Sequence, residues 1–211
     1  MENNLSVLFG MPLWNFKADN FTELNEKLIE AIEEEKKTDK GIQLSNQGGW
    51  QSHGMLHFKD GFKPLVDLIN KHLQQVGKDY GFGRATSQLK VTSMWANSNT
   101  HGNSNKLHSH QSPSGMPNPL VISGCYYVRV PPNSGEFVLE DFSRPMRYLQ
   151  LPFQEPNLMN SFTIKIPPSA GKLLFFPAWM EHSVEENKSN EERISIAFNV
   201  GIINQPMKRP G

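Results

Sequence analysis

Apolar residues in the first part of the chain recur at helical spacing and predict two amphipathic helices. The first helix follows Asn20 or Thr22, either of which can cap it, and runs into a charged segment that ends just before Gly41. The second helix is expected over residues 61–77, with Gly77 and Gly81 closing it, and a short strand is expected over residues 5–16. The apolar faces of the two helices consist of Phe21, Leu24, Leu28, Ile29 and Ile32, and of Phe62, Leu65, Val66, Ile69 and Leu73.

From about residue 87 the pattern changes to short β-rich runs with turn residues between them. The turns are expected at residues 97–105, 131–135, 167–171 and 187–190. No helical segment separates the strands, which excludes a parallel sheet with crossover helices and predicts a sandwich or barrel. The runs are QLKVTSMWAN, PLVISGCYYVRV, GEFVLEDF, SFTIKIPP, GKLLFFPAW, HSVEEN and RISIAFNVGII.

These patterns together predict one domain over residues 1–211. Its helical N-terminal part, about residues 1–86, is expected to support a β-core over about residues 87–204. A chain of 211 residues is long enough to bury a substantial core.

Charge and cysteine content narrow the classes of function. Lys plus Arg and Asp plus Glu both number 21, so the net charge is zero and no nucleic-acid partner is expected. Cys125 is the single cysteine, which favours a reducing, cytoplasmic location. The sequence has neither a signal-peptide pattern nor an apolar run of the roughly 20 residues that a membrane crossing needs.

Three histidines form a candidate metal site. His108 and His110 lie two positions apart in the string NKLHSHQ, and in an extended chain such residues point to the same face, about 6–7 Å apart at Cα. His182 follows an apolar strand and can meet the pair from a neighbouring strand. The alternative for the pair is a chance occurrence on the surface, since the chain has seven histidines.

Arg193 and Ser195 form a candidate anion site. Arg193, Ser195 and Ala197 alternate on one face of the last strand. An arginine that points into a β-sandwich is costly unless it meets an anion, and its planar fork matches a carboxylate. The alternative is an arginine at the sheet edge that pairs with Glu191 or Glu192.

The order of these features resembles the Fe(II)/2-oxoglutarate oxygenase superfamily. The segments NKLHSHQ, ISGCYYVRVPPNSGEFVLED, GKLLFFPAWMEHSVEEN and ERISIAFN are similar to a family of such oxygenases in bacteria and phages, with an HxH…H…RxS motif. The resemblance implies a double-stranded β-helix, or jelly-roll, core and a reaction that uses Fe(II), 2-oxoglutarate and O2. It also implies hydroxylation of an unidentified substrate, with release of succinate and CO2.

The resemblance also assigns roles to individual residues. His108, His110 and His182 would be the metal ligands, and Arg193, Ser195 and Tyr127 would hold the 2-oxoglutarate carboxylate. Ser123 and Cys125 share a face with Tyr127 and would line the same cavity, and Cys125 is expected to be a packing residue. Three further residues are expected near the site: Trp95 and Asn97 on the preceding strand, and Asn105 as a partner that orients a ligand.

One position departs from the superfamily pattern. The usual triad is two histidines and one carboxylate, and the carboxylate position here is His110. Asp141 or Glu140 could supply the missing carboxylate. Two alternatives therefore stay open: a cupin-like three-histidine enzyme that does not use 2-oxoglutarate, and a non-catalytic jelly-roll module that binds a metal. The expected substrate is a small molecule or a peptide, and the oligomeric state is open, with a homodimer as one option.

Overall fold

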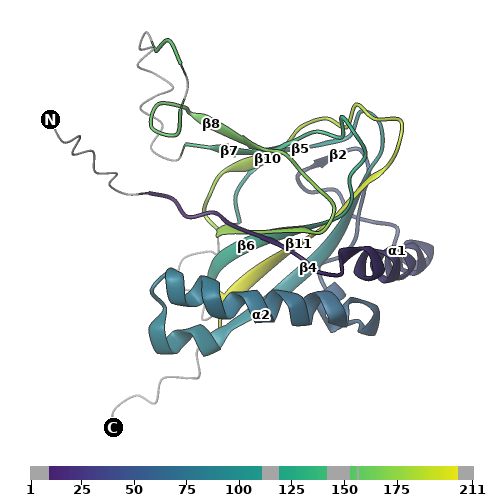
Figure 1. Ribbon diagram of the computed structural model, residues 1–211. Helices are drawn as coiled ribbons and strands as arrows, with labels where there is room; N and C mark the ends of the chain where they lie inside the picture. Colours follow the sequence, from purple (N-terminus) through teal and green to yellow (C-terminus); the bar gives the residue numbers. More distant parts are fainter. Residues whose placement is uncertain (1–9, 111–118, 142–152, 156, 204–211) are drawn as a thin grey trace, which may run out of the picture.

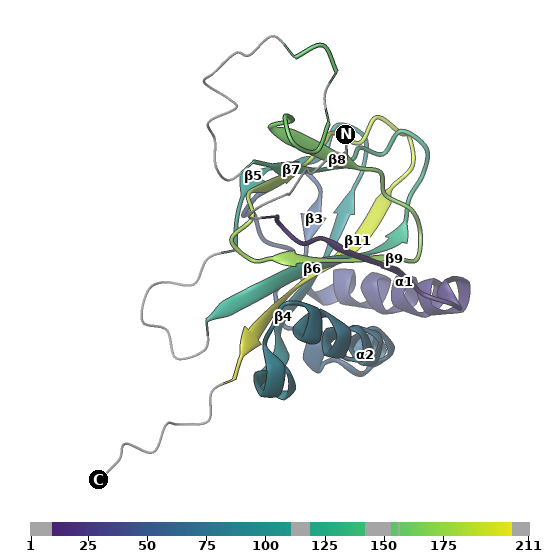
Figure 2. The same cartoon turned by 60° about the vertical axis from the view of Figure 1, so that its left-hand side comes forward.

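Two antiparallel β-sheets face each other, and two helices cover the outer face of the larger sheet (Figures 1 and 2). The computed structural model describes residues 10–110, 119–141, 153–155 and 157–203. The larger sheet has the strand order β1 (Trp14–Lys17), β9 (Lys172–Pro177), β6 (Leu120–Arg129), β11 (Arg193–Ile202), β4 (Leu89–Asn99) and β3 (Trp50–Gln51). The smaller sheet has the order β2 (Asn46–Gln47), β5 (Ser104–His108), β10 (His182–Val184), β7 (Phe137–Glu140) and β8 (Thr163–Ile166).

The two helices pack against the larger sheet through the apolar faces that the sequence predicts. Helix α1 (Phe21–Thr38) begins directly after Asn20, although the Asn20 side chain makes no capping hydrogen bond. Helix α2 (Lys63–Asp79) begins after two short 3-10 turns, η1 (Leu56–Phe58) and η2 (Asp60–Phe62), and a third, η3 (Gly83–Gln88), leads into β4. The cluster that joins helices and sheet includes Leu28, Ile32, Leu65, Ile69, Leu73, Ile194, Ile196 and Phe198. Each such buried side chain stabilises the fold by about 1.5–3 kcal/mol.

Strand β11 alternates as the sequence predicts. Ile194, Ile196 and Phe198 belong to the core under the helices, whereas Arg193, Ser195 and Ala197 line a cavity between the two sheets. The mainly β fold with N-terminal helices is confirmed, and its two sheets enclose the space in which the site lies. Among the described residues, no helix has both the length and the apolar character that a membrane crossing requires.

Several predicted boundaries differ from those of the structure. The first described strand is β1, at residues 14–17, and residues 5–9 of the predicted strand lie outside the described residues. The predicted turn at 97–105 is shorter, since residues 97–99 end β4 and residues 104–108 form β5. The sequence does not predict β2 and β3, because a two-residue strand has no alternation to detect.

Gly77 does not close the second helix. It lies inside α2 and is buried. A Cβ at this position would lie only 2.5 Å from Thr86 Cγ2 and 2.9 Å from Leu89 Cδ1, so only glycine fits there. Its role is close packing of the helix on the following segment. Gly81, with a φ of 82°, follows the helix as predicted and adopts the left-handed conformation that glycine tolerates.

We expect Gly124→Ala to destabilise the fold strongly. A Cβ at this position would lie 2.2 Å from Phe198 Cζ and 2.5 Å from the Leu174 carbonyl oxygen, so ring and backbone would both have to move. Overpacking of this kind costs about 1–3 kcal/mol or more. Urea denaturation measures the loss. The matched control is Gly10→Ala, whose Cβ would meet no atom within 4 Å. Equal stability of the two variants would contradict the packing at β6.

Candidate active site

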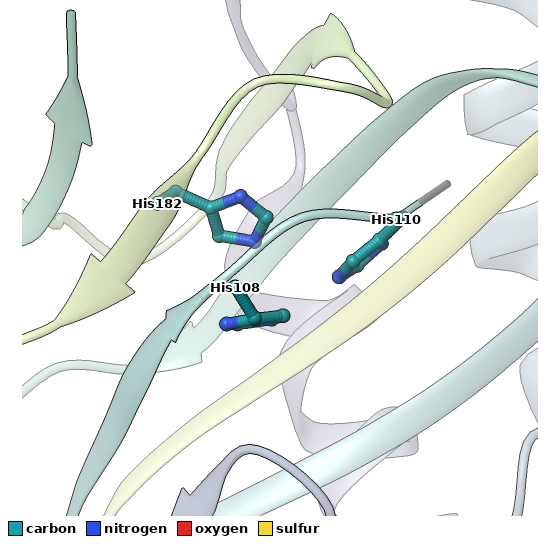
Figure 3. Close-up of side chains that lie close together, drawn as sticks. All are labelled: His108, His110 and His182. Carbon is teal, nitrogen blue, oxygen red and sulfur yellow. The ribbon is translucent and has the colours of Figure 1, made fainter. Parts of the chain in front are cut away.

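Three histidines meet between the two sheets (Figure 3). His182 begins β10 and is the direct cross-strand partner of His108, the last residue of β5. His110 is held two residues further on, where its backbone N–H donates to the Ala178 carbonyl at 2.8 Å. The candidate ligand nitrogens all lie within 4.8 Å of one another. Neighbouring ligands of an octahedral ion, each at about 2.1 Å, are about 3 Å apart, so small rotations of the rings would bring all three onto one cation.

Each ring has an acceptor at Nδ1, which fixes where its proton sits. His108 Nδ1 lies 2.7 Å from the Lys106 carbonyl oxygen, and His182 Nδ1 lies 2.9 Å from that of Met180. His110 Nδ1 lies 2.6 Å from Asn199 Oδ1. Since a carbonyl oxygen can only accept, Nδ1 carries the hydrogen in each ring and Nε2 keeps its lone pair. All three histidines can therefore offer Nε2 to a cation.

Burial keeps the three imidazoles uncharged. Desolvation, together with the nearby rings of His108 and His110, lowers the pKa of His182 to about 3. Desolvation also lowers the pKa of His110 to about 4 and that of His108 below its usual value. His182 is only 4% exposed and lies against the rings of Phe137 and Phe176. Near neutral pH the site thus holds three neutral rings, the form that binds metal.

Arg193 is a buried cation without a carboxylate partner in the described part of the chain. It is 2% exposed, and its Nη1 donates to the carbonyl oxygens of Ser134, at 2.5 Å, and Gly135, at 3.4 Å. Desolvation lowers the pKa of its guanidinium, which nevertheless stays protonated. The rest of its fork remains available in a cavity where an anion would offset the cost of burying the charge.

The alternative of a surface arginine paired with a neighbouring glutamate is wrong. The Glu192 carboxylate instead binds Lys36 of α1 at 2.8 Å and Arg129 of β6 at 3.2 Å, and it accepts a short hydrogen bond from Ser98 of β4. These partners come from the helix that covers the outer face of the sheet and from the two strands that flank β11, and Glu191 is exposed. Arg193 is therefore free to face the cavity.

Most of the remaining predicted residues line the cavity that holds Arg193, and one lies behind His110. Tyr127, Ser195, Asn97, Trp95 and Cys125 line a small cavity of about 50 Å3, together with Arg193 and the three histidines. Burial raises the pKa values of the Cys125 thiol, to about 12, and of the Tyr127 hydroxyl, so both stay protonated. Asn105 also lines this cavity, but its side chain pairs with Asn99 and Ser45 and orients none of the histidines.

Ser123 lies elsewhere. Its hydroxyl is 2.9 Å from His110 Nδ1 and 2.8 Å from Asn199 Oδ1, so it supports a candidate metal ligand and is absent from the lining of the cavity that holds Arg193. Within the described ranges no carboxylate joins the histidine cluster, and neither Asp141 nor Glu140 belongs to it. The three-histidine set is the arrangement that the described residues support.

The sequence reasoning misses Asn199. Its Oδ1 accepts from His110 and Ser123, while its Nδ2 donates to Ser93 Oγ at 3.0 Å, so the amide cannot flip without losing hydrogen bonds. The alternation of the last strand predicts that Asn199 points toward the site. Asn199 continues the inward series of Arg193, Ser195 and Ala197, at the end nearest the histidines.

An open cleft of about 670 Å3 adjoins the site. His108 and His110 line both this cleft and the smaller cavity, so the cleft is the access to the histidines from outside. A larger hollow, of about 920 Å3, lies among the loops at residues 130–136, 167–168 and 185–188. It shares no lining residue with either of the other two and contains no histidine.

Solved structures of 2-oxoglutarate oxygenases share this architecture, which is therefore a double-stranded β-helix. A prolyl-4-hydroxylase of Pseudomonas putida matches with a TM-score of 0.64 and 11% identity, over 90% of this chain and 92% of its own. The viral collagen prolyl hydroxylase of Paramecium Bursaria Chlorella virus-1, solved with 2-oxoglutarate, matches with a TM-score of 0.58 and 15% identity, over 89% and 95%. HygX from Streptomyces hygroscopicus, solved with nickel, 2-oxoglutarate and hygromycin B, matches with a TM-score of 0.60 and 12% identity, over 90% and 83%.

The sequence of the β-core identifies the family to which the chain belongs. Residues 93–199 match the family described as "Putative 2OG-Fe(II) oxygenase", and the chain belongs to this family. The matched segment contains the three histidines, Arg193, Ser195 and Asn199. No protein of curated function matches the chain significantly.

We expect the purified chain to bind about one Fe(II), or Ni(II) in its place, through the three histidines. His182→Ala should abolish binding, because it removes the most buried ring of the cluster. His110→Asp should retain the metal, since it restores the common carboxylate. Metal content per chain after anaerobic loading and desalting measures both effects, and His101→Ala, on the exposed turn after β4, is the control. Full occupancy in His182→Ala would remove that residue from the site.

We expect Asn199→Ala to weaken Ni(II) binding by about 10–100-fold, the usual effect of losing a partner that orients a ligating histidine. Asn199→Asp keeps an acceptor at the same place and should retain affinity. Ser93→Ala removes only a support of the Asn199 amide and should have a smaller effect. Competition with a metal chelator gives the three affinities. If Asn199→Ala binds Ni(II) like the wild type, the amide does not position His110.

Proposed function

We propose that this chain is a non-haem Fe(II)- and 2-oxoglutarate-dependent oxygenase that hydroxylates a small-molecule or peptidyl substrate. One observation carries the proposal beyond the family: a buried guanidinium that has no carboxylate partner among the described residues lines the same cavity as three histidines whose Nε2 lone pairs are free for a cation. A metal chelator with a second carboxylate at its far end satisfies both groups at once. 2-Oxoglutarate has that structure.

The protein supplies ligands, orientation and charge. When bound, Fe(II) couples the oxidation of 2-oxoglutarate by O2, to succinate and CO2, to the conversion of a substrate C–H into C–OH. His108, His110 and His182 would hold the metal. Arg193 would donate two parallel hydrogen bonds to the far carboxylate, and the hydroxyls of Ser195 and Tyr127 would donate to the same group.

The charges of the groups support this assignment. Three neutral imidazoles leave the two positive charges of Fe(II) uncompensated, whereas a triad with a carboxylate leaves one. A dianionic 2-oxoacid brings two negative charges, and Arg193 adds one positive charge at the other end of the cavity. The replacement of a carboxylate by His110 therefore makes the metal end of the site a better receptor for a dianion.

The two alternatives predict a different role for Arg193. A cupin-like enzyme without 2-oxoglutarate, or a non-catalytic metal-binding module, needs no anion receptor beside its histidines. The cost of burying the Arg193 charge would then have no compensation in function. The position of Arg193 therefore favours the use of a carboxylate co-substrate.

We expect Arg193→Ala to raise the dissociation constant for 2-oxoglutarate at least about tenfold, since a charge-assisted pair contributes about 1.5–3 kcal/mol and 1.4 kcal/mol is one decade. Metal affinity should stay nearly unchanged. Arg193→Lys should rescue only in part, because an ammonium cannot reproduce the planar fork. The assay is calorimetric titration of 2-oxoglutarate into Ni(II)-loaded protein, with Arg84→Ala on η3 as the control.

The possible results separate the proposals. Absence of 2-oxoglutarate binding to the wild type would end the co-substrate proposal and favour the cupin-like alternative. Wild-type affinity in a folded Arg193→Ala protein would leave the co-substrate in place but would remove Arg193 from its recognition. Thermal unfolding of each variant shows whether the buried substitution has preserved the fold.

A further inference from the structure

Four polar side chains form a row across the inner face of the larger sheet. Gln51 of β3 is the Cα partner of Asn97 of β4, Asn97 is the partner of Ser195 of β11, and Ser195 is the partner of Tyr127 of β6. Gln51 lines the open cleft, and the other three line the small cavity with Arg193. The row thus leads from the entrance cleft to the proposed co-substrate site, and the amide of Gln51 has no role in the function proposed above.

The two amides in this row are buried, and within the described chain no donor forms a hydrogen bond with either carbonyl oxygen. Gln51 is 3% exposed and Asn97 is 9% exposed, and within the described chain neither Gln51 Oε1 nor Asn97 Oδ1 receives a hydrogen bond. A buried acceptor in this state is unfavourable. Other polar groups of the cleft are engaged: Ser52 Oγ accepts from the Ala96 backbone, and Ser93 Oγ accepts from Asn199. The carbonyl oxygen of Gln51 is therefore a buried acceptor at the wall of the cleft that still needs a donor.

The walls of the cleft contain few charged side chains. Their apolar part comes from Ile42, Leu44, Trp95, Leu107 and Leu120. Apart from the histidines, the only ionisable side chain among the described lining residues is Lys106, which is exposed at the rim. No carboxylate among these residues could pair with a cationic ligand.

The chemistry of a primary amide narrows the class of ligand that the cleft can bind. A glutamine side chain offers one acceptor and two donors in one plane, and a ligand amide, with its own N–H and C=O, can satisfy both kinds at once. A carboxylate would satisfy only the donors and would repel Oε1. An ammonium would satisfy only the acceptor and would bury an unpaired charge.

We propose that the cleft recognises an uncharged substrate through an amide group that pairs with Gln51, while an aliphatic part of the substrate packs on Trp95, Leu107 and Leu120. Asn97 lies beside Gln51 and extends the same hydrogen-bonding edge toward the cavity. The proposal rests on the proposed function, because it describes the substrate of that reaction. The cleft adjoins His108 and His110, so an aliphatic C–H of a ligand bound there lies toward the metal site.

The test compares three probes that share one aliphatic body and differ in charge. N-acetyl-L-leucine methylamide is uncharged, N-acetyl-L-leucine carries a carboxylate, and L-leucine methylamide carries an ammonium. Each is titrated by ligand-observed NMR into the full chain loaded with Ni(II) and 2-oxoglutarate. We expect the uncharged probe to bind with a dissociation constant of about 1 mM, at least about tenfold tighter than either charged probe.

Variants of Gln51 connect the preference to this residue. Gln51→Leu should remove the preference for the uncharged probe, and Gln51→Glu should shift it toward the ammonium probe, because a carboxylate accepts from and attracts a cation. Gln74→Leu, on the exposed side of α2, is the matched control and should bind all three probes like the wild type. The backbone pairing of β3 does not depend on the side chain, and unfolding temperatures confirm that each variant is folded.

Any of three outcomes would overturn the proposal: a wild-type preference for a charged probe, no binding of the uncharged probe at about 10 mM, or an unchanged preference in both Gln51 variants. Binding of Ni(II) and of 2-oxoglutarate is measured on the same samples. If both bind and the uncharged probe is not preferred, the proposed function stands and this inference falls. If 2-oxoglutarate does not bind, the proposed function falls, while the probes still test the cleft in the Ni(II)-loaded protein.

Discussion

The two-residue alternation of β11 is the constraint that joins the fold of this protein to its site. The strand lies near the middle of the larger sheet and is buried on both faces, so each of its residues belongs either to the core under the helices or to the cavity between the sheets. A slip of one residue in its pairing would bury Arg193 among aliphatic side chains and place Phe198 in the cavity. The apolar core therefore fixes the register, and the register places Arg193, Ser195 and Asn199.

The electrostatics of the interior follow from this arrangement. The histidine end holds neutral rings whose Nδ1 protons go to neutral acceptors, two backbone carbonyls and the Asn199 amide. Arg193, the one buried cation among the described residues, lies on β11 with Asn199, and the neighbouring Glu192 is held away from it by Lys36 and Arg129. An interior built in this way has a deficit of negative charge that a metal-bound dianion would fill.

The two hollows at the site differ in chemistry, and the difference is consistent with two different ligands. The small cavity between the sheets is lined by the guanidinium of Arg193, three hydroxyls, two amides and the thiol of Cys125, a set suited to a compact anion. The larger cleft is mainly aliphatic and aromatic, with the uncharged amide of Gln51. His108 and His110 line both hollows, so the proposed co-substrate and the proposed substrate, which differ in polarity, would each lie next to the histidines.

The sequence by itself determined the class of fold and most of its elements. Periodicity located both helices, β4 and the strands from β6 onward, and the spacing of His108, His110, His182 and Arg193 pointed to groups that line one cavity in the structure. Local pattern could not supply what depends on neighbours distant in the chain. The local pattern predicts a helix end at Gly77, because the close approach of Gly77 to Thr86 is a tertiary contact that the pattern does not contain. Strands β2 and β3 are too short to show a period. The sequence likewise leaves open whether Arg193 meets Glu192 or the cavity, because the partners of Glu192 come from α1, β4 and β6. The pairing of Gln51 with Asn97, and of Asn199 with His110, is decided only when strands far apart in sequence lie side by side, because hydrogen-bond partners across a sheet are set by register and not by sequence distance.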